Sequence, residues 1–303
     1  ALGIANMFVS NTIGAKLSQS FFASYIQDDF KVTRNLVLNL GLRYQTSTPW
    51  APSDTSTLTD GSKMGPFATF IPGHKSSVFV NAPTGLVYPG DEGVPSAIIN
   101  QDKNDFGPRF GFAWDVFGNG KTSVRGGYGL FFGTLQGDMS SISSVYSAPF
   151  FINFGVAQTP SFVHPIPDTL TTAFPVPIAK NMSFTPYEPL TIQGMQPNTV
   201  NPMVHQANFT VQQQLPGKIA LQLGWVSNSS IHLLNYNPLN PAVYIPGTDA
   251  SGNALSTVAN TNSRRVLNLS NPPATGAAYY YAAVEVGESG ETSHYNALQM
   301  EVR

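Results

Sequence analysis

The stretch FGNGKTS at residues 117–123 ends in the glycine-lysine-threonine triplet that closes a phosphate-binding loop. A Walker loop has the pattern G-x-x-x-x-G-K-[ST], because its backbone N–H groups surround the phosphates while the lysine and hydroxyl complete the site. Asp115 stands where the first glycine should be, and its carboxylate would repel the anion. No helical periodicity follows the triplet, and Gly-Asn-Gly at 118–120 is good hairpin chemistry. The stretch therefore predicts a tight turn between two strands.

Other residues that could carry chemistry lack the spacing that a site requires. The carboxylates of Asp28 and Asp29 point to opposite sides of a predicted strand, so they cannot act together on one bond. Residues 102–105 have the look of a calcium loop, but Ala113 stands where its bidentate glutamate should be. The histidines stand singly, without metal-ligand spacing: His74, His164, His205, His232 and His294. We predict no catalytic residue, no cofactor site and no metal site.

The composition describes a chain with few ions on its surface. Charged residues make up 11% of the 303 residues, against roughly 25% in ordinary soluble domains. The formal net charge is −2, which provides no basic field to attract nucleic acid. Glycine (27) and proline (24) are abundant, as in chains with many turns.

The chain has no cysteine, which excludes disulfides, zinc-thiolate sites and thiol nucleophiles. Its first residues lack the basic region of a signal peptide, and no window reaches 18 apolar residues. A membrane protein built of helices is thereby excluded, whereas a membrane β-barrel is not. The chain begins without methionine and ends inside a predicted strand, so we expect an internal piece of a longer protein.

Segments of alternating apolar and polar residues predict an all-β fold with at least seven antiparallel strands. A bulge is expected near Asp28, which interrupts an apolar face. The predicted strands are residues 21–32, 36–45, 109–116, 123–132, 206–215, 219–226 and 294–303.

The connections between these strands alternate strictly between short turns and very long loops. The loops span about 55 to 65 residues each, at 47–104, 135–201 and 229–290, where usual loops have about 4 to 6 residues. Residues 278–286 are expected to form an extra loop hairpin or an eighth strand. A soluble sandwich has no reason to separate its loops by length, but an outer-membrane barrel has short periplasmic turns and long extracellular loops.

Each predicted strand has one apolar face and one polar face. We expect the apolar faces to contact lipid and the polar faces to line a lumen, because a packed core would not accept so many unpaired polar groups. A soluble sandwich whose apolar faces pack together is the alternative. The candidate lumen-facing residues are Asn39, Arg43, Arg109, Asp115, Arg125, Asn208, Gln212, Gln222 and Glu301.

Three segments resemble one known family. SYIQDDFKVTRNLVLNLGLRYQ (24–45), NDFGPRFGFAWDVFGNGKTSVRGGYGLFF (104–132) and SHYNALQMEVR (293–303) are similar to the barrel of TonB-dependent outer-membrane receptors, most closely the Oar-like group. The resemblance covers nearly all predicted strands and none of the long loops. It implies a transmembrane up-and-down β-barrel of 22 strands, closed by an N-terminal plug, in the outer membrane of a Gram-negative bacterium.

The same resemblance implies the function and the partners. Such receptors move a bulky nutrient such as a carbohydrate, a peptide or a chelate inward, using energy delivered by the TonB complex through the plug. Residues 1–303 lack the plug, the TonB box and a final strand, so we expect a partial receptor barrel of about seven or eight strands. The expected partners are outer-membrane lipid, the TonB complex through the missing plug segment, and an unknown nutrient.

Two groups of residues are candidates for contact with that nutrient. Arg109 and Arg125 could meet a carboxylate of the substrate or the plug, but a structural ladder with Asp115 is the favoured interpretation. Aromatic side chains in the loops could stack on a sugar or another flat ligand, or simply pack the loops together: Trp50, Phe67, Tyr88 and Tyr146. A soluble or surface-attached β-sandwich for adhesion or carbohydrate binding remains the alternative function, and no constellation supports an enzyme.

Overall fold

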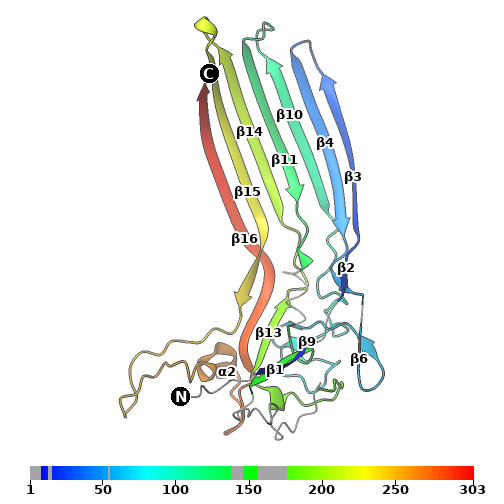
Figure 1. Ribbon diagram of the computed structural model, residues 1–303, viewed down its shortest axis with the longest axis vertical. Coiled ribbons are helices and arrows are strands. Elements are labelled where there is room, and N and C mark those ends of the chain that lie inside the picture. The colour runs from blue at the N-terminus through cyan, green and yellow to red at the C-terminus, as the bar shows by residue number, and fades with distance from the viewer. Residues whose placement is uncertain (1–7, 13–15, 54, 138–145, 156–175) are drawn as a thin grey trace, which may run out of the picture.

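A computed structural model describes residues 8–12, 16–53, 55–137, 146–155 and 176–303. Seven long strands of this part form one continuous antiparallel meander, drawn upright in Figure 1. They are β3 (Phe21–Lys31), β4 (Leu36–Ser47), β10 (Asp105–Asp115), β11 (Thr122–Phe132), β14 (Met203–Gln214), β15 (Ala220–Pro238) and β16 (Tyr281–Val302). All seven predicted strands are thus present, and the predicted all-β fold is confirmed.

Short strands and helical turns fill the connections. An eighth strand of the large sheet, β13 (Leu190–Met195), pairs in parallel with β16. Two-stranded pairs are β1 (Phe8–Thr12) with β12 (Phe151–Gly155), β2 (Leu17–Ser18) with β5 (Ala51–Pro52), β6 (Ser56–Thr57) with β7 (Lys63–Met64), and β8 (Thr69–Phe70) with β9 (Leu86–Val87). The helical elements are η2 (Thr185–Tyr187), η3 (Pro216–Lys218), η4 (Asn262–Arg264) and α2 (Val266–Ser270). In the described part of the chain, no helix is long and apolar enough to cross a membrane.

The short turns are staggered across the sheet. Pairing ends at Val37 in the first hairpin, and Val37 lies opposite Ala113, two residues before the end of pairing in the second. The third hairpin extends two residues further again, to Gln214. Each hairpin turn is thus shifted along the strand direction by two residues, about 6.7 Å, relative to the hairpin before it, and two strands together are about 9.6 Å wide. If the turns lie at one level, this shift tilts the strands by about 35° from the barrel axis. Strands in closed β-barrels have this tilt.

One glycine shows how the sheet accommodates its large side chains. A Cβ atom on Gly126 would lie 2.5 Å from the ring of Phe112 on the neighbouring strand, so only glycine leaves room for that ring. Phe112 in turn lies 6.4 Å from the ring of Phe209 across the same position. Gly126 thus lies between two aromatic residues on the neighbouring strands, where a close approach of a ring to the backbone requires glycine.

The structure corrects two expectations about the strands. The pairing of β3 with β4 is continuous, so no bulge occurs at Asp28, which lies near the hairpin end and is exposed there. The last long loop is shorter than predicted, because β15 continues to Pro238 and β16 begins at Tyr281. Residues 281–286 are therefore the start of β16 rather than a separate strand or hairpin. A register irregularity between Ser230 and Leu234 marks the point where the two strands extend beyond the others.

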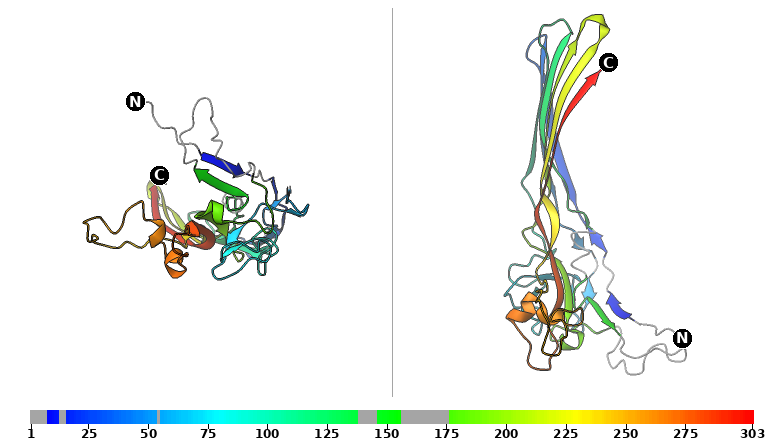
Figure 2. Two further views of the ribbon diagram at one scale, coloured as in Figure 1. Left: turned by 90° about the horizontal axis from the view of Figure 1, so that it is seen from below. Right: turned by 90° about the vertical axis from the view of Figure 1, so that its left-hand side faces the viewer.

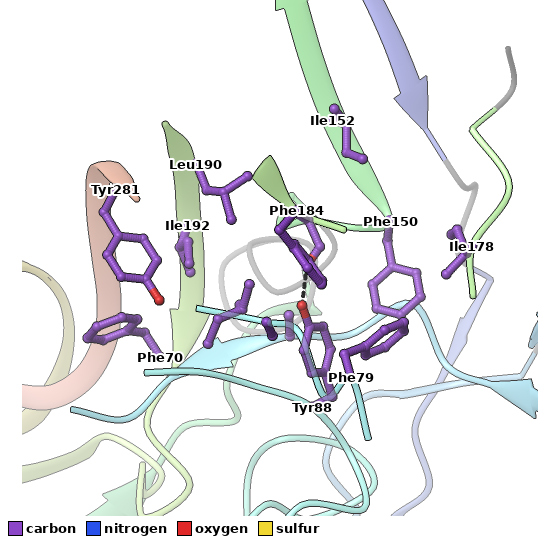
Figure 3. Close-up of a cluster of buried hydrophobic side chains, with 14 of the residues drawn as sticks. Phe70, Phe79, Tyr88, Phe150, Ile152, Ile178, Phe184, Leu190, Ile192 and Tyr281 are labelled. Carbon is purple, nitrogen blue, oxygen red and sulfur yellow. Dashed lines mark hydrogen bonds between the residues drawn. The ribbon is translucent and has the colours of Figure 1, made fainter. Parts of the chain in front are cut away.

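At the end opposite the short turns, the long connections fold into a compact body that we call the loop module. It consists of the described residues of 48–104 and 133–202 together with β13 and the first part of β16 (Figures 1 and 2). Its core is aromatic: Phe79 is fully buried and lies 4.4 Å from the ring of Tyr88 and 6.2 Å from the rings of Phe150 and Phe184 (Figure 3). Burial of each such ring contributes about 1.5–3 kcal/mol.

Hydrogen bonds from buried polar groups tie the parts of the loop module together. The Tyr88 hydroxyl donates to the carbonyl of Ala148 at 2.8 Å, drawn as a dashed line in Figure 3. The Tyr281 hydroxyl donates to the carbonyl of Thr84 at 2.9 Å, which joins β16 to the first long loop. Because these partners are far apart in sequence, each bond fixes one loop against another.

Asp91 is the main electrostatic anchor of the loop module. One carboxylate oxygen accepts hydrogen bonds from the backbone N–H of Ser77 (2.6 Å) and Val78 (3.0 Å), and the other accepts one from the N–H of Tyr88 (2.9 Å). Burial alone would raise the pKa of Asp91, but hydrogen bonds from Ser76, Tyr88 and Ser77 together lower it below its usual value of 3.8.

The pKa of Asp91 predicts that the loop module loses stability in acid. A carboxyl whose pKa is lowered by folding contributes stability that is fully present above the unfolded-state value near 3.8 and is lost as the pH falls through the folded value. We expect Asp91→Asn to lower the unfolding free energy of the module by about 1–3 kcal/mol at neutral pH, and to remove much of its sensitivity below pH 4. Thermal unfolding followed by near-UV circular dichroism between pH 3 and 7 measures this, with the exposed neighbour Glu92→Gln as the control.

Candidate functional site

Asp115, the acidic residue that argued against a phosphate-binding loop, forms hydrogen bonds that stabilise the turn at 117–123. The carboxylate of Asp115 accepts hydrogen bonds from the N–H of Gly118 at 3.1 Å and of Gly120 at 2.9 Å. Both glycines have positive φ, 68° and 73°, which is the conformation that glycine adopts most easily. The N–H groups that would bind a phosphate are thus already satisfied by a side chain of the same hairpin, and the predicted turn is confirmed.

The described residues include no group of three or more histidine, cysteine, aspartate or glutamate side chains that could hold a metal ion. His164 lies outside the described residues. Two other histidines, His205 and His294, lie in one row across the sheet with Ser229 between them, and each bonds to its own partner. Tyr128 contacts Nδ1 of His205 at 2.7 Å, and Ser229 contacts Nδ1 of His294 at 2.9 Å.

The strand pairing places the nine candidate lumen residues on one face of the sheet. Opposite residues in an antiparallel sheet point to the same side. One row across the sheet runs through Asp115, Ser123, Gln212, Gln222 and Glu301, each opposite the next. The other candidate residues lie on the same face in adjacent rows: Asn39, Arg43, Arg109, Arg125 and Asn208. We call this the inner face, and that it borders a lumen stays a prediction.

Polar side chains on the inner face bond to one another across strands. The amide of Gln212 donates to Oε1 of Gln222 at 2.5 Å. The amide of Asn39 donates to the carboxylate of Asp29 at 2.6 Å, which gives that acid a structural partner on β3. Glu301 pairs with Arg303, which directly follows the end of β16. These contacts form a polar lattice along the wall.

The expected ladder between the arginines and Asp115 is wrong. Asp115 directs both carboxylate oxygens to the turn N–H groups, which are closer in sequence and rigidly placed. Arg125 donates from Nε to the hydroxyl of Ser123 at 3.2 Å. Arg109 instead lies over the ring of Phe131 at 4.7 Å from its centroid, a cation–π contact worth about 0.5–1 kcal/mol at an exposed site.

The structure separates the four loop aromatics into two pairs. Phe67 and Tyr88 are fully buried in the two hydrophobic clusters of the loop module, so they pack the loops and cannot contact a ligand. The expectation of ligand contact is corrected for these two residues, because the long loops have a core of their own. Trp50 is half-buried and donates from its ring to the carbonyl of Leu135 at 3.1 Å. Tyr146 is 41% exposed.

Tyr146 lies at a hollow that sequence patterns did not reveal. Its ring meets that of Phe151 edge to face at 5.0 Å, and both line the hollow with Tyr187 and Gln193. The hydroxyl of Ser147 fixes the backbone of Gln193 by donating to its carbonyl at 2.7 Å and accepting from its N–H at 3.0 Å. No local period indicates this arrangement, since it depends on Ser147 lying against Gln193 of β13, 46 positions away in the chain.

The face opposite the inner face is apolar and uncovered. Leu298 is 80% exposed and Met300 70%, and Phe110, Phe209 and Trp225 are each more than 40% exposed. In the described residues, the only extended sheet is this one, so no second layer packs on these side chains as a β-sandwich would require. An exposed apolar face of this size would be unstable in water and fits contact with lipid.

Comparison with protein families matches residues 2–303 to the model of the outer membrane beta barrel domain. The chain belongs to this family. It is therefore a β-barrel domain of the Gram-negative outer membrane, and contact of its exposed apolar face with lipid stays a prediction. No match was found among curated proteins.

Solved structures with some likeness to this outer membrane beta barrel domain include two chains. A chain from the structure of the FpvAI–pyocin S2 complex has 11% identity and a TM-score of 0.34, with 94% of this chain and 24% of that one covered. The outer membrane transporter YddB from Escherichia coli has 12% identity and a TM-score of 0.36, with coverages of 94% and 30%. The chain spans less than a third of the length of either structure.

The orientation of the outer membrane beta barrel domain in lipid predicts opposite fates for two neighbouring residues. Phe209 lies on the apolar face, five residues from the end of pairing at Gln214. At a strand tilt of about 35°, this distance places Phe209 about 14 Å above the turns. That height is near the middle of the apolar band of a membrane barrel, which is about 25 Å tall. We expect Phe209→Arg to lower the unfolding free energy in lipid vesicles by about 2–4 kcal/mol, the cost of arginine at that depth.

The matched control is Asn208→Arg, which places the same charge one residue away on the inner face and should cost less than about 1 kcal/mol. Urea unfolding of the full-length protein in vesicles measures both values. Equal costs for the two substitutions would contradict the assignment of the faces.

Proposed function

We propose that residues 1–303 are part of the wall and the outer loops of an Oar-like, TonB-dependent transporter. Its function would be binding and passage of a bulky nutrient rather than catalysis, with energy from the TonB complex delivered through a plug. A closed barrel of 22 strands is part of this proposal. The resemblance of the three strand segments supports the family group, and the tilt of about 35° fits a closed barrel.

The observation that carries the proposal is the compact loop module at the end opposite the short turns. A barrel that serves only as a membrane anchor has no need for long connections of about 40 to 70 residues each. Here the described residues of the first two connections fold around an aromatic core. Loops with a fixed core hold exposed side chains in set positions, which is what selective binding requires. The hollow lined by Tyr146, Phe151 and Tyr187 is our candidate for the first contact.

The inner face supplies the second part of the proposed path. Its arginines are held by a ring, a hydroxyl and an amide rather than by carboxylates: Arg109 by Phe131, Arg125 by Ser123, and Arg43 by Gln45. None of the three takes part in an ion pair of the described residues, which are Lys180 with Asp60 and Arg303 with Glu301. Their charges are therefore free to act on a solute that carries carboxylate or phosphate groups.

Uptake measurements on a deletion strain test the proposed function. We expect deletion of the gene to abolish growth or accumulation with one nutrient from a panel of oligosaccharides, peptides and iron chelates, and deletion of tonB to have the same effect. Restoration with the double variant Arg109→Gln and Arg125→Gln should lower the uptake rate several-fold at an equal amount of protein in the outer membrane.

The matched control is Lys180→Gln, which removes one positive charge from an exposed ion pair of the loop module. It should restore uptake fully. Unchanged uptake of every nutrient in the deletion strain, or uptake that continues without tonB, would overturn the proposal.

A further inference from the structure

Asp105 is the one described residue with a buried side-chain oxygen that has no hydrogen-bond partner. It is the first residue of β10, at the end near the loop module, and it is only 1% exposed. Its Oδ2 accepts a hydrogen bond from the amide of Asn201 at 2.7 Å, whereas Oδ1 has no partner. The residue opposite, Gln45, directs its amide to the carbonyl of Phe132 instead. A buried carboxylate oxygen left in this way is costly and calls for a compensating group.

A second carboxylate converges on the same asparagine. Oδ2 of Asp102 accepts a hydrogen bond from the backbone N–H of Asn201 at 3.1 Å, so Asn201 lies against both acids. No lysine or arginine in the described part of the chain forms an ion pair with either carboxylate, and the intervening Lys103 is exposed. Two carboxylates therefore lie near each other in a partly dehydrated environment without a positively charged partner. This raises the free-energy cost of ionising each of them.

A small hollow lies against Asp102 and Asn201. Its volume is about 20 Å³, and it is lined by the polar residues Ser47, Asn100 and Thr199 and by apolar residues, among them Ile99 and Leu135. This volume holds one water molecule or one ion. Carboxylates, amide carbonyls, hydroxyls and water are the ligands that calcium takes, six to eight at a time and in flexible geometry.

We propose that Asp102 and Asp105 bind one calcium ion at the junction between the sheet and the loop module, with oxygen atoms of Asn201 and water completing its shell. The ion would neutralise both carboxylates and give Oδ1 of Asp105 the partner that it lacks. Magnesium fits less well, because it demands near-octahedral geometry and retains most of its own water.

The position of the proposed ion gives it a mechanical role. Asp102 lies near the end of the first long connection, three residues before β10, and Asn201 lies near the end of the second, two residues before β14. The carbonyl of Asp102 also accepts a hydrogen bond from the hydroxyl of Thr46 in β4 at 2.7 Å. An ion at this point would therefore hold two long loops to the rim of the sheet, so that calcium outside the cell would stiffen the loop module.

Calcium binding to the full-length protein in detergent tests the proposal. Equilibrium dialysis with radioactive calcium after treatment with EDTA should show one bound ion per chain that Asp105→Asn or Asp102→Asn removes. One millimolar calcium should raise the melting temperature of the loop module by several degrees, and the same concentration of magnesium should raise it much less. Asn at 105 keeps an acceptor for Asn201, so the variant removes the charge and little else.

The control is Asp249→Asn, which removes a carboxylate that bonds only within its own exposed turn. This variant should bind calcium and gain stability as the unaltered protein does. The proposal is overturned if the unaltered protein binds no calcium, or if Asp105→Asn and Asp102→Asn both bind it normally. The proposal is also overturned if calcium does not stabilise the loop module but a fall in pH from 7 to 5 does, a range above that in which Asp91 becomes protonated, since a proton would then be the compensating group.

Discussion

The hydrogen-bond ladder between the seven long strands is the constraint on which the rest of the structure depends. In a membrane, every backbone N–H and C=O must be paired within the protein, and a strand achieves this only through its neighbours. The ladder fixes which residues lie opposite one another, and the period of two then assigns each side chain to one face. A single-residue slip in any strand would send its leucines and phenylalanines to the polar side.

The two faces of the sheet carry different kinds of side chain. On the apolar face, large side chains such as Phe112 and Phe209 lie next to glycine, so that rings fill the space above a neighbouring backbone. On the inner face, amides and hydroxyls bond across strands, as Gln212 does with Gln222. Arg109 keeps its charge on this face by stacking on Phe131 rather than by pairing with an acid. Hydrogen bonds and stacking rather than ion pairs thus hold most polar side chains of the inner face, consistent with the low content of charged residues.

The loop module obeys different rules from the sheet. It is a small globular body with an aromatic core, built from segments that are about 100 residues apart in the chain. Its polar anchors are single buried groups that each collect several bonds, such as Asp91 with the N–H groups of Ser77, Val78 and Tyr88. The parallel pairing of β13 with the extension of β16 joins this body to the sheet, so the two parts are mechanically continuous.

The sequence by itself determined the strands, their two faces, the short turns and the alternation of short and long connections, because all of these follow from a local period and from turn chemistry. It also indicated that Asp115 belongs to a turn. Only the tertiary structure decided that Phe67 and Tyr88 are core residues, that β13 joins the sheet, and that Asp105 meets Asn201. These contacts link residues far apart in the chain, 96 positions in the case of Asp105 and Asn201. No local pattern encodes such a contact, since it exists only once the hydrogen-bond ladder has brought the ends of the strands together.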